Sequence, residues 1–248
     1  MNIDAILTPA ELPGLAGRDL KGTACVVFDI LRATSTFVTA LHHGAKGIIP
    51  AAEISEALAV KKKQPAVLLG GEREGVRIRA AQTGGVDFDF GNSPREYTAD
   101  KVRGKTIVST TTNGTRAFRA CAGAKTIVAG SFLNLTATAV FLREKKISDV
   151  LLVCAGTRES AALEDVLAAG AMCDLLSSDP ESLSDAAQTA FHAFVAVRDD
   201  LALAVSDSRN ARRVASIPEL QADVAYCLQS DIYPFVAAMD REGVLRAL

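Results

Sequence analysis

The chain has 248 residues, a net charge of −2 and 49% hydrophobic residues, which is enough apolar material for a sizeable core and argues against disorder. It has no basic excess, no Trp and only three Tyr, so we expect no nucleic-acid partner. No uncharged apolar stretch approaches the roughly 18 residues of a membrane span, and the N-terminus lacks a signal pattern. We therefore expect a cytoplasmic protein without a membrane partner.

The cysteines and histidines do not suggest a reactive centre. The five cysteines are odd in number, scattered and without a CxxC pair, which indicates buried small hydrophobes in a reducing compartment. The three histidines all lie inside helical patterns: His42, His43 and His192. Zinc binding, disulfides and a histidine-based mechanism are therefore disfavoured.

The first strongly patterned segment follows about 20 irregular residues that leave room for one edge strand. Residues 24–28 form a short apolar run that predicts a buried strand, and a helical pattern with Phe37 and Leu41 follows. Between them lie a carboxylate, a guanidinium and three hydroxyls: Asp29, Arg32, Thr34, Ser35 and Thr36. We expect Thr34 or Ser35 to cap this helix.

This turn has the groups that a phosphate ester and a divalent cation require. Asp29 offers oxygen ligands to Mg²⁺, and Arg32 offers a bidentate fork to phosphate. The helix start adds backbone N–H groups and the positive end of its dipole. An ordinary strand-to-helix turn with an exposed ion pair uses the same residue types and stays an alternative.

Strands and helices then alternate along the chain. Apolar runs predict strands at 46–50, 66–69, 105–109, 126–129 and 150–155. Helical patterns occur at 54–63 and 94–97, after residue 116 as far as residue 121, at 135–145, and from residue 163 onward. The last third has helical patterns at 184–205 and 218–228 and an apolar run at 233–239. This order predicts one α/β domain over residues 1–248, a three-layer α/β/α fold with a mostly parallel sheet and a helix-rich C-terminal third packed on it.

Polar turns follow most of these strands. Because carboxyl ends of parallel strands lie at one edge of a sheet, we expect the turns to converge there. We expect Asp29, Arg32 and Glu72 to be catalytic. The predicted substrate-binding residues are Arg32, Thr34, Ser35, Arg73, Asn92, Ser93, Thr112, Asn113, Gly114, Thr115, Ser131 and Asn134.

The acidic residues of these turns are predicted to bind Mg²⁺. They are Asp29, Glu72, Glu164 and Asp165, and convergent carboxylates would repel one another without a cation. Their plainer interpretation is stabilisation of helix starts. We interpret Arg158 as a surface charge, and His192 with the Arg212–Arg213 pair as structural residues outside the site.

Three common phosphate and nucleotide motifs are missing. The sequence has no GxxxxGK[ST], which disfavours a P-loop ATPase, and no GxGxxG, which removes the main argument for NAD. Asp29 is followed two residues later by Leu31, so it lacks the second acid of a DxD aspartyl-phosphatase.

Six motifs together resemble the 2-phosphosulfolactate phosphatase family. They are FDILRATSTFVTALHHGA, GGEREG, FDFGNSPREY, STTTNGTRA, GSFLN and a CAG…ALED…AG run, which lie in this order between residues 28 and 170. The resemblance implies a Mg²⁺-dependent acid phosphatase of α/β/α fold that converts 2-phosphosulfolactate to sulfolactate and phosphate, a step of coenzyme M synthesis in methanogens. The sequence departs from the family pattern in the polar segment 75–85 and at Ala161–Ala162.

The expected function is thus hydrolysis of a small, multiply anionic phosphomonoester. We favour attack by a metal-activated water, with an aspartyl-phosphate on Asp29 as the second mechanism. A non-catalytic binding protein for a phosphorylated metabolite is the alternative of a different class. The sequence leaves a homo-oligomer open.

Overall fold

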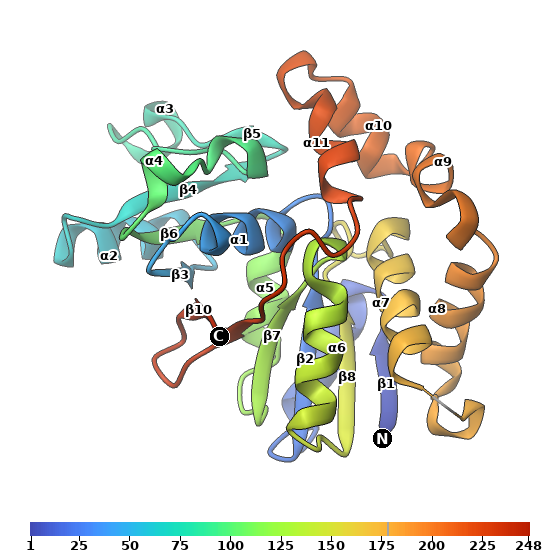
Figure 1. Ribbon diagram of the computed structural model, residues 1–248. Coiled ribbons are helices and arrows are strands. Elements are labelled where there is room, and N and C mark those ends of the chain that lie inside the picture. Colours follow the sequence, from blue (N-terminus) through green and yellow to red (C-terminus); the bar gives the residue numbers. More distant parts are fainter. Residues whose placement is uncertain (178) are drawn as a thin grey trace.

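The computed structural model describes residues 1–177 and 179–248, and Figure 1 shows their arrangement. The strands are β1 (Asn2–Ile6), β2 (Thr23–Phe28), β3 (Gly47–Pro50), β4 (Leu68–Arg73), β5 (Val76–Arg77), β6 (Thr106–Thr110), β7 (Thr126–Gly130), β8 (Asp149–Cys154), β9 (Ala237–Met239) and β10 (Leu245–Ala247). They form one ten-stranded sheet in the order β1-β8-β2-β7-β9-β10-β3-β6-β4-β5.

The helices occupy both faces of this sheet. They are α1 (Ala33–His42), α2 (Ile54–Lys63), α3 (Ala80–Thr83), α4 (Ala99–Val102), α5 (Gly114–Ala120), α6 (Leu135–Glu144), α7 (Leu163–Leu176), α8 (Asp185–Val195), α9 (Leu201–Ser206), α10 (Arg209–Ala215) and α11 (Gln221–Cys227). Short 3₁₀ turns connect several of them. The predicted α/β class with a mostly parallel sheet is confirmed. No helix in residues 1–177 or 179–248 is long and apolar enough to cross a membrane.

The core explains why β2 and β8 are apolar after their first residues. Successive side chains of a strand point to opposite faces. In β2, Cys25 and Val27 join the cluster beneath α1 and α5, whereas Val26 and Phe28 join the cluster beneath α6 and α7. Both faces are thus covered, and full burial of a side chain such as Phe28 contributes about 1.5–3 kcal/mol. All five cysteines are buried and free, as predicted.

The parallel strands fall into two blocks. β1, β8, β2 and β7 pair in parallel, as do β3, β6 and β4. The hairpin β9–β10 joins the blocks through three antiparallel pairings, which reverse the strand direction between them. The blocks lie across one another in Figure 1, and their carboxyl ends meet at one place. The expected convergence of the turns therefore occurs, but between two blocks of opposite strand direction rather than along one edge of a single parallel sheet.

Several predicted boundaries also differ from the structure. The helix expected over 184–205 is divided into α8 and α9 by a 3₁₀ turn at Arg198–Asp200. α10 and β10 were not predicted, and the apolar run 233–239 contributes only the short strand β9. β4 extends to Arg73 rather than ending at Leu69, because it pairs with β5 as well as β6. This extension places Glu72 inside a strand.

Candidate active site

A cavity of about 150 Å³ lies where the carboxyl ends of the two blocks meet, and α10 closes one of its sides. Six of the predicted site residues line it, namely Asp29, Arg32, Glu72, Asn92, Thr112 and Asn113. The other predicted site residues are not among those that line this cavity.

Asp29 directly follows β2, and its carboxylate accepts the first backbone N–H of α1. The N–H of Ala33 donates to its Oδ1 at 3.0 Å, and its own N–H donates to Thr34 Oγ1 at 3.1 Å. A side chain at Gly114 would place its first carbon 2.7 Å from Asp29 Oδ2, so only glycine admits this close approach. Burial, together with the nearby charges of Glu72 and Glu164, raises the pKa of Asp29 to about 7.

This raised pKa predicts a pH-dependent stability in metal-free buffer. Folding favours the protonated carboxyl, so the contribution of Asp29 to the unfolding free energy is greatest below its unfolded pKa of 3.8 and is lost as the pH rises toward 7. Between pH 5 and pH 8 the wild type should lose about 2 kcal/mol relative to Asp29→Asn. Urea unfolding of both proteins measures this difference. A difference that does not change with pH would mean that the carboxyl stays ionised.

Glu72 faces the cavity from β4 and is held by three donors. The N–H and the hydroxyl of Thr112 both donate to Oε1 at 2.9 Å, and the N–H of Gly75 donates to Oε2 at 2.6 Å. These bonds connect β4 to the turn after β6. Each carboxylate oxygen keeps further lone-pair capacity toward the cavity.

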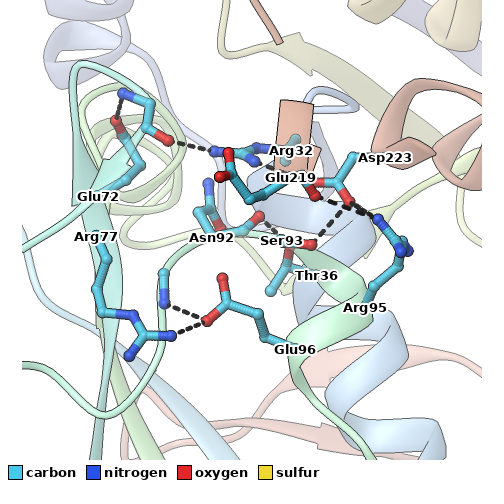
Figure 2. A network of polar contacts seen from close by, with 12 residues as sticks. Arg32, Thr36, Glu72, Arg77, Asn92, Ser93, Arg95, Glu96, Glu219 and Asp223 are labelled. Atoms are coloured by element: carbon cyan, nitrogen blue, oxygen red, sulfur yellow. Dashed lines mark hydrogen bonds and ion pairs between the residues drawn. The ribbon is translucent and has the colours of Figure 1, made fainter. Parts of the chain in front are cut away.

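Arg32 is buried and already paired. Its Nη1 lies 2.9 Å from Asp223 Oδ2, and its Nη2 donates to the carbonyl of Gly75 at 2.7 Å. The side chains of Arg32 and Asp223 are 3% and 0% exposed. Figure 2 shows Asp223 accepting also from Ser93 at 2.7 Å, with Arg95 at 3.7 Å. The sequence allowed an exposed ion pair at this turn. Arg32 does form an ion pair, but the pair is buried and its acidic partner, Asp223, belongs to α11.

Glu164 and Asp165 begin α7 beneath the cavity and do not line it. Asp165 accepts the N–H groups of Ile30 at 2.8 Å and Gly156 at 2.9 Å, so it holds the ends of two strands together. Burial raises the pKa of Asp165 well above its ordinary value, with the charges of Asp29 and Glu164 adding to it. Glu164 accepts from Asn210 at 2.6 Å through Oε1, whereas its buried Oε2 has no hydrogen-bond partner in the described part of the chain.

Most of the other predicted residues make structural hydrogen bonds. Ser35 donates to the carbonyl of Ile30 and contacts Ser131 Oγ at 2.9 Å, and Asn134 Oδ1 caps the N–H of Ser131. We expected Thr34 or Ser35 to cap α1, but α1 starts at Ala33 after Arg32, because Asp29 binds its first N–H. Arg73 donates to the hydroxyl of Thr110, and the hydroxyl of Thr115 donates to the carbonyl of Thr111. Ser93 donates to Asp223, and Gly114 lies against Asp29.

The C-terminal third contributes a wall that sequence reasoning missed. Asn210, Arg213 and Val214 of α10 line the cavity, and so does Arg158 from the turn after β8. The prediction that Arg212 and Arg213 lie outside the site is therefore wrong for Arg213. No local motif marks α10. The only sequence signal was a pair of adjacent arginines on a helix, which is common on surfaces.

The donor set agrees with Mg²⁺ in chemistry but does not form a closed cage. Within residues 1–177 and 179–248, no group of three His, Cys, Asp or Glu side chains is arranged to hold a metal. Proteins usually bind Mg²⁺ through one or two carboxylates, with waters and substrate phosphates completing the shell. Asp29 and Glu72 supply two such carboxylates, and the buried Oδ1 of Asn92, which lines the same cavity, has no hydrogen-bond partner among the residues that the structure describes.

Comparison with known proteins assigns a family. The model of the family described as 2-phosphosulpholactate phosphatase matches residues 7–242. A protein from Thermotoga petrophila is 42% identical over 237 residues, which cover 96% of this chain and 95% of that protein. A protein from Caldicellulosiruptor saccharolyticus is 39% identical over 86% of this chain and 87% of its own length. A protein from Clostridium acetobutylicum is 36% identical over 95% of this chain and 96% of its own length. Each of the three is named as a probable 2-phosphosulfolactate phosphatase.

Proposed function

The chain belongs to the 2-phosphosulfolactate phosphatase family, and from this premise we propose that it hydrolyses a phosphate monoester to an alcohol and inorganic phosphate. The proposed substrate is 2-phosphosulfolactate, which carries phosphate, carboxylate and sulfonate on three carbons. Four of the six family motifs contribute residues that line the cavity, among them Asp29, Glu72, Asn92 and Thr112.

One observation carries this proposal, namely the pairing of acidic and basic groups within a single cavity. Asp29 and Glu72 face it from β2 and β4, while Arg32, Arg158 and Arg213 line it as well. A site that only bound an anion would gain nothing from two carboxylates next to that anion. Carboxylates are useful where a cation joins them to phosphate, which favours catalysis over the alternative of a non-catalytic binding protein.

We propose that Mg²⁺ is the cation and that Asp29 and Glu72 hold it. The raised pKa of Asp29 supports this role, because a divalent cation would relieve the repulsion by Glu72 and Glu164 that contributes to it. A bound Mg²⁺ would offset charge on the phosphoryl group and lower the pKa of a coordinated water. Asp165 would act indirectly, by holding the strand end that carries Asp29.

The protein's own groups define two routes for phosphoryl transfer. In the favoured route a water attacks phosphorus directly, the ester P–O bond breaks, and the alcohol leaves with a proton that the water gives up, while Asp29 and Glu72 stay unmodified. In the second, Asp29 Oδ2 attacks phosphorus and the alcohol leaves, after which water releases phosphate from the carboxyl. Arg32 lines the cavity and is held in place by its ion pair with Asp223.

A divalent-cation test examines the proposal directly. We expect EDTA to abolish release of phosphate from 2-phosphosulfolactate, and excess Mg²⁺ to restore it better than Zn²⁺, because oxygen ligands predominate and no His or Cys lines the cavity. Phosphate release is measured across a panel of phosphate esters with each metal. Full activity in chelator would exclude the metal, and no release from any ester would exclude the phosphatase.

A further inference from the structure

We propose that Arg213 on α10 binds the anionic substituent of the substrate that does not react, the sulfonate or carboxylate beside the phosphate ester. Arg213 would thereby make α10 the element that selects esters with a second negative charge. This inference rests on the proposed phosphatase function and adds a role for a residue outside the family's N-terminal motifs.

The position of Arg213 supports this role. It lines the cavity, and a side chain at Gly75 would place its first carbon 3.0 Å from Arg213 Nη2, so the guanidinium lies against this turn. Gly75 has a φ of +85° and binds Glu72 through its N–H and Arg32 through its carbonyl. Gly75 therefore lies between the guanidinium of Arg213 and the side chains of Arg32 and Glu72, which we place at the reacting phosphate.

The charge of Arg213 is available to a ligand. Of the three arginines that line the cavity, Arg32 is paired with Asp223, whereas Arg158 and Arg213 form no ion pair with any residue in 1–177 or 179–248. Glu74 also lines the cavity, but among the described residues it forms no ion pair with Arg213. An unpaired guanidinium offers a planar fork that matches the oxygens of a sulfonate or carboxylate.

The residues that line the cavity differ in character. Asp29 and Glu72 are acidic, so an anion would bind beside them through a cation. The wall from α10 and the following turn contains Arg213 next to the apolar side chains of Val214 and Ile217. Arg213 is exposed, so a ligand can reach its guanidinium. A ligand that uses both features therefore carries a metal-bound phosphate and a second anionic group.

Substrate comparison with a neighbouring arginine as control tests the proposal. For Arg213→Met we expect the ratio of kcat/KM for 2-phosphosulfolactate to kcat/KM for phenyl phosphate to fall at least tenfold, mainly through KM. Arg213→Lys should lose part of this ratio, because the charge remains but the fork is lost. Arg212→Met is the matched control, since Arg212 is exposed on the same helix and does not line the cavity, and its ratio should equal that of the wild type.

Two results would overturn the assignment. An unchanged ratio in Arg213→Met would show that the guanidinium does not sense the second anion, and equal losses on both esters would place it at the phosphate or in the structure. Calorimetric binding of sulfolactate compared with lactate gives a readout without turnover. If the wild type hydrolyses no ester, the proposed function fails, while a preference for sulfolactate that disappears in Arg213→Met still supports the binding role.

Discussion

Asp29→Asn should lower kcat/KM by about 10³-fold or more, equivalent to roughly 4 kcal/mol of transition-state stabilisation. The amide keeps the size of the side chain and can still accept from Ala33, but it supplies a poorer oxygen for a cation and is no nucleophile. Steady-state phosphate release with purified wild type and variant measures the loss. Near wild-type activity would remove Asp29 from the reaction.

The same variant separates the two routes at the phosphorus atom. If Asp29 only holds Mg²⁺, raising the Mg²⁺ concentration should recover part of the rate, whereas loss of a nucleophile cannot be recovered by metal. A substrate with a chiral, isotopically labelled phosphoryl group tests the wild type independently. Direct attack by water inverts the phosphorus centre, and two successive displacements through Asp29 retain it. We expect inversion and partial recovery, and retention would establish the aspartyl-phosphate.

Much of this site was predictable because its residues follow apolar runs. Residues 24–28 indicated a strand from composition alone, and the placement of Asp29 after that strand put its carboxylate at a carboxyl end. The same reasoning located Glu72 and Thr112, which are joined by two hydrogen bonds. Local pattern is sufficient here since each residue is adjacent in sequence to the strand that positions it.

The residues of α10 that line the cavity, and the residue of α11 that pairs with Arg32, were not predictable in the same way. Asp223 is 191 residues from its partner Arg32, and nothing in the pattern around it distinguishes a buried acid from an exposed one. The bend between the two strand blocks depends on the hairpin β9–β10, whose strands have three residues each. Such short elements have weak periodicity, so the path of the C-terminal third required the three-dimensional structure.

Asp223→Ala should cause the largest loss of stability, a fall of about 3–5 kcal/mol in the free energy of unfolding. The substitution leaves the guanidinium of Arg32 buried without a counter-charge and removes the acceptor of Ser93 at 2.7 Å. Urea unfolding of the wild type and the variant measures the difference. Arg116→Ala is the control, because its pair with Glu159 is exposed and should contribute about 1 kcal/mol or less.

A double variant distinguishes the cost of the unpaired charge from that of lost packing. Arg32→Met combined with Asp223→Leu removes both charges and fills the space with apolar groups, so it should recover much of the stability that Asp223→Ala loses. Its phosphatase activity should stay low, since Arg32 lines the cavity. If the double variant is as unstable as the single one, hydrogen bonds to Ser93 and packing by α11 dominate. If Asp223→Ala unfolds like the wild type, Arg32 does not depend on this ion pair, and its charge is free to bind phosphate without help from α11.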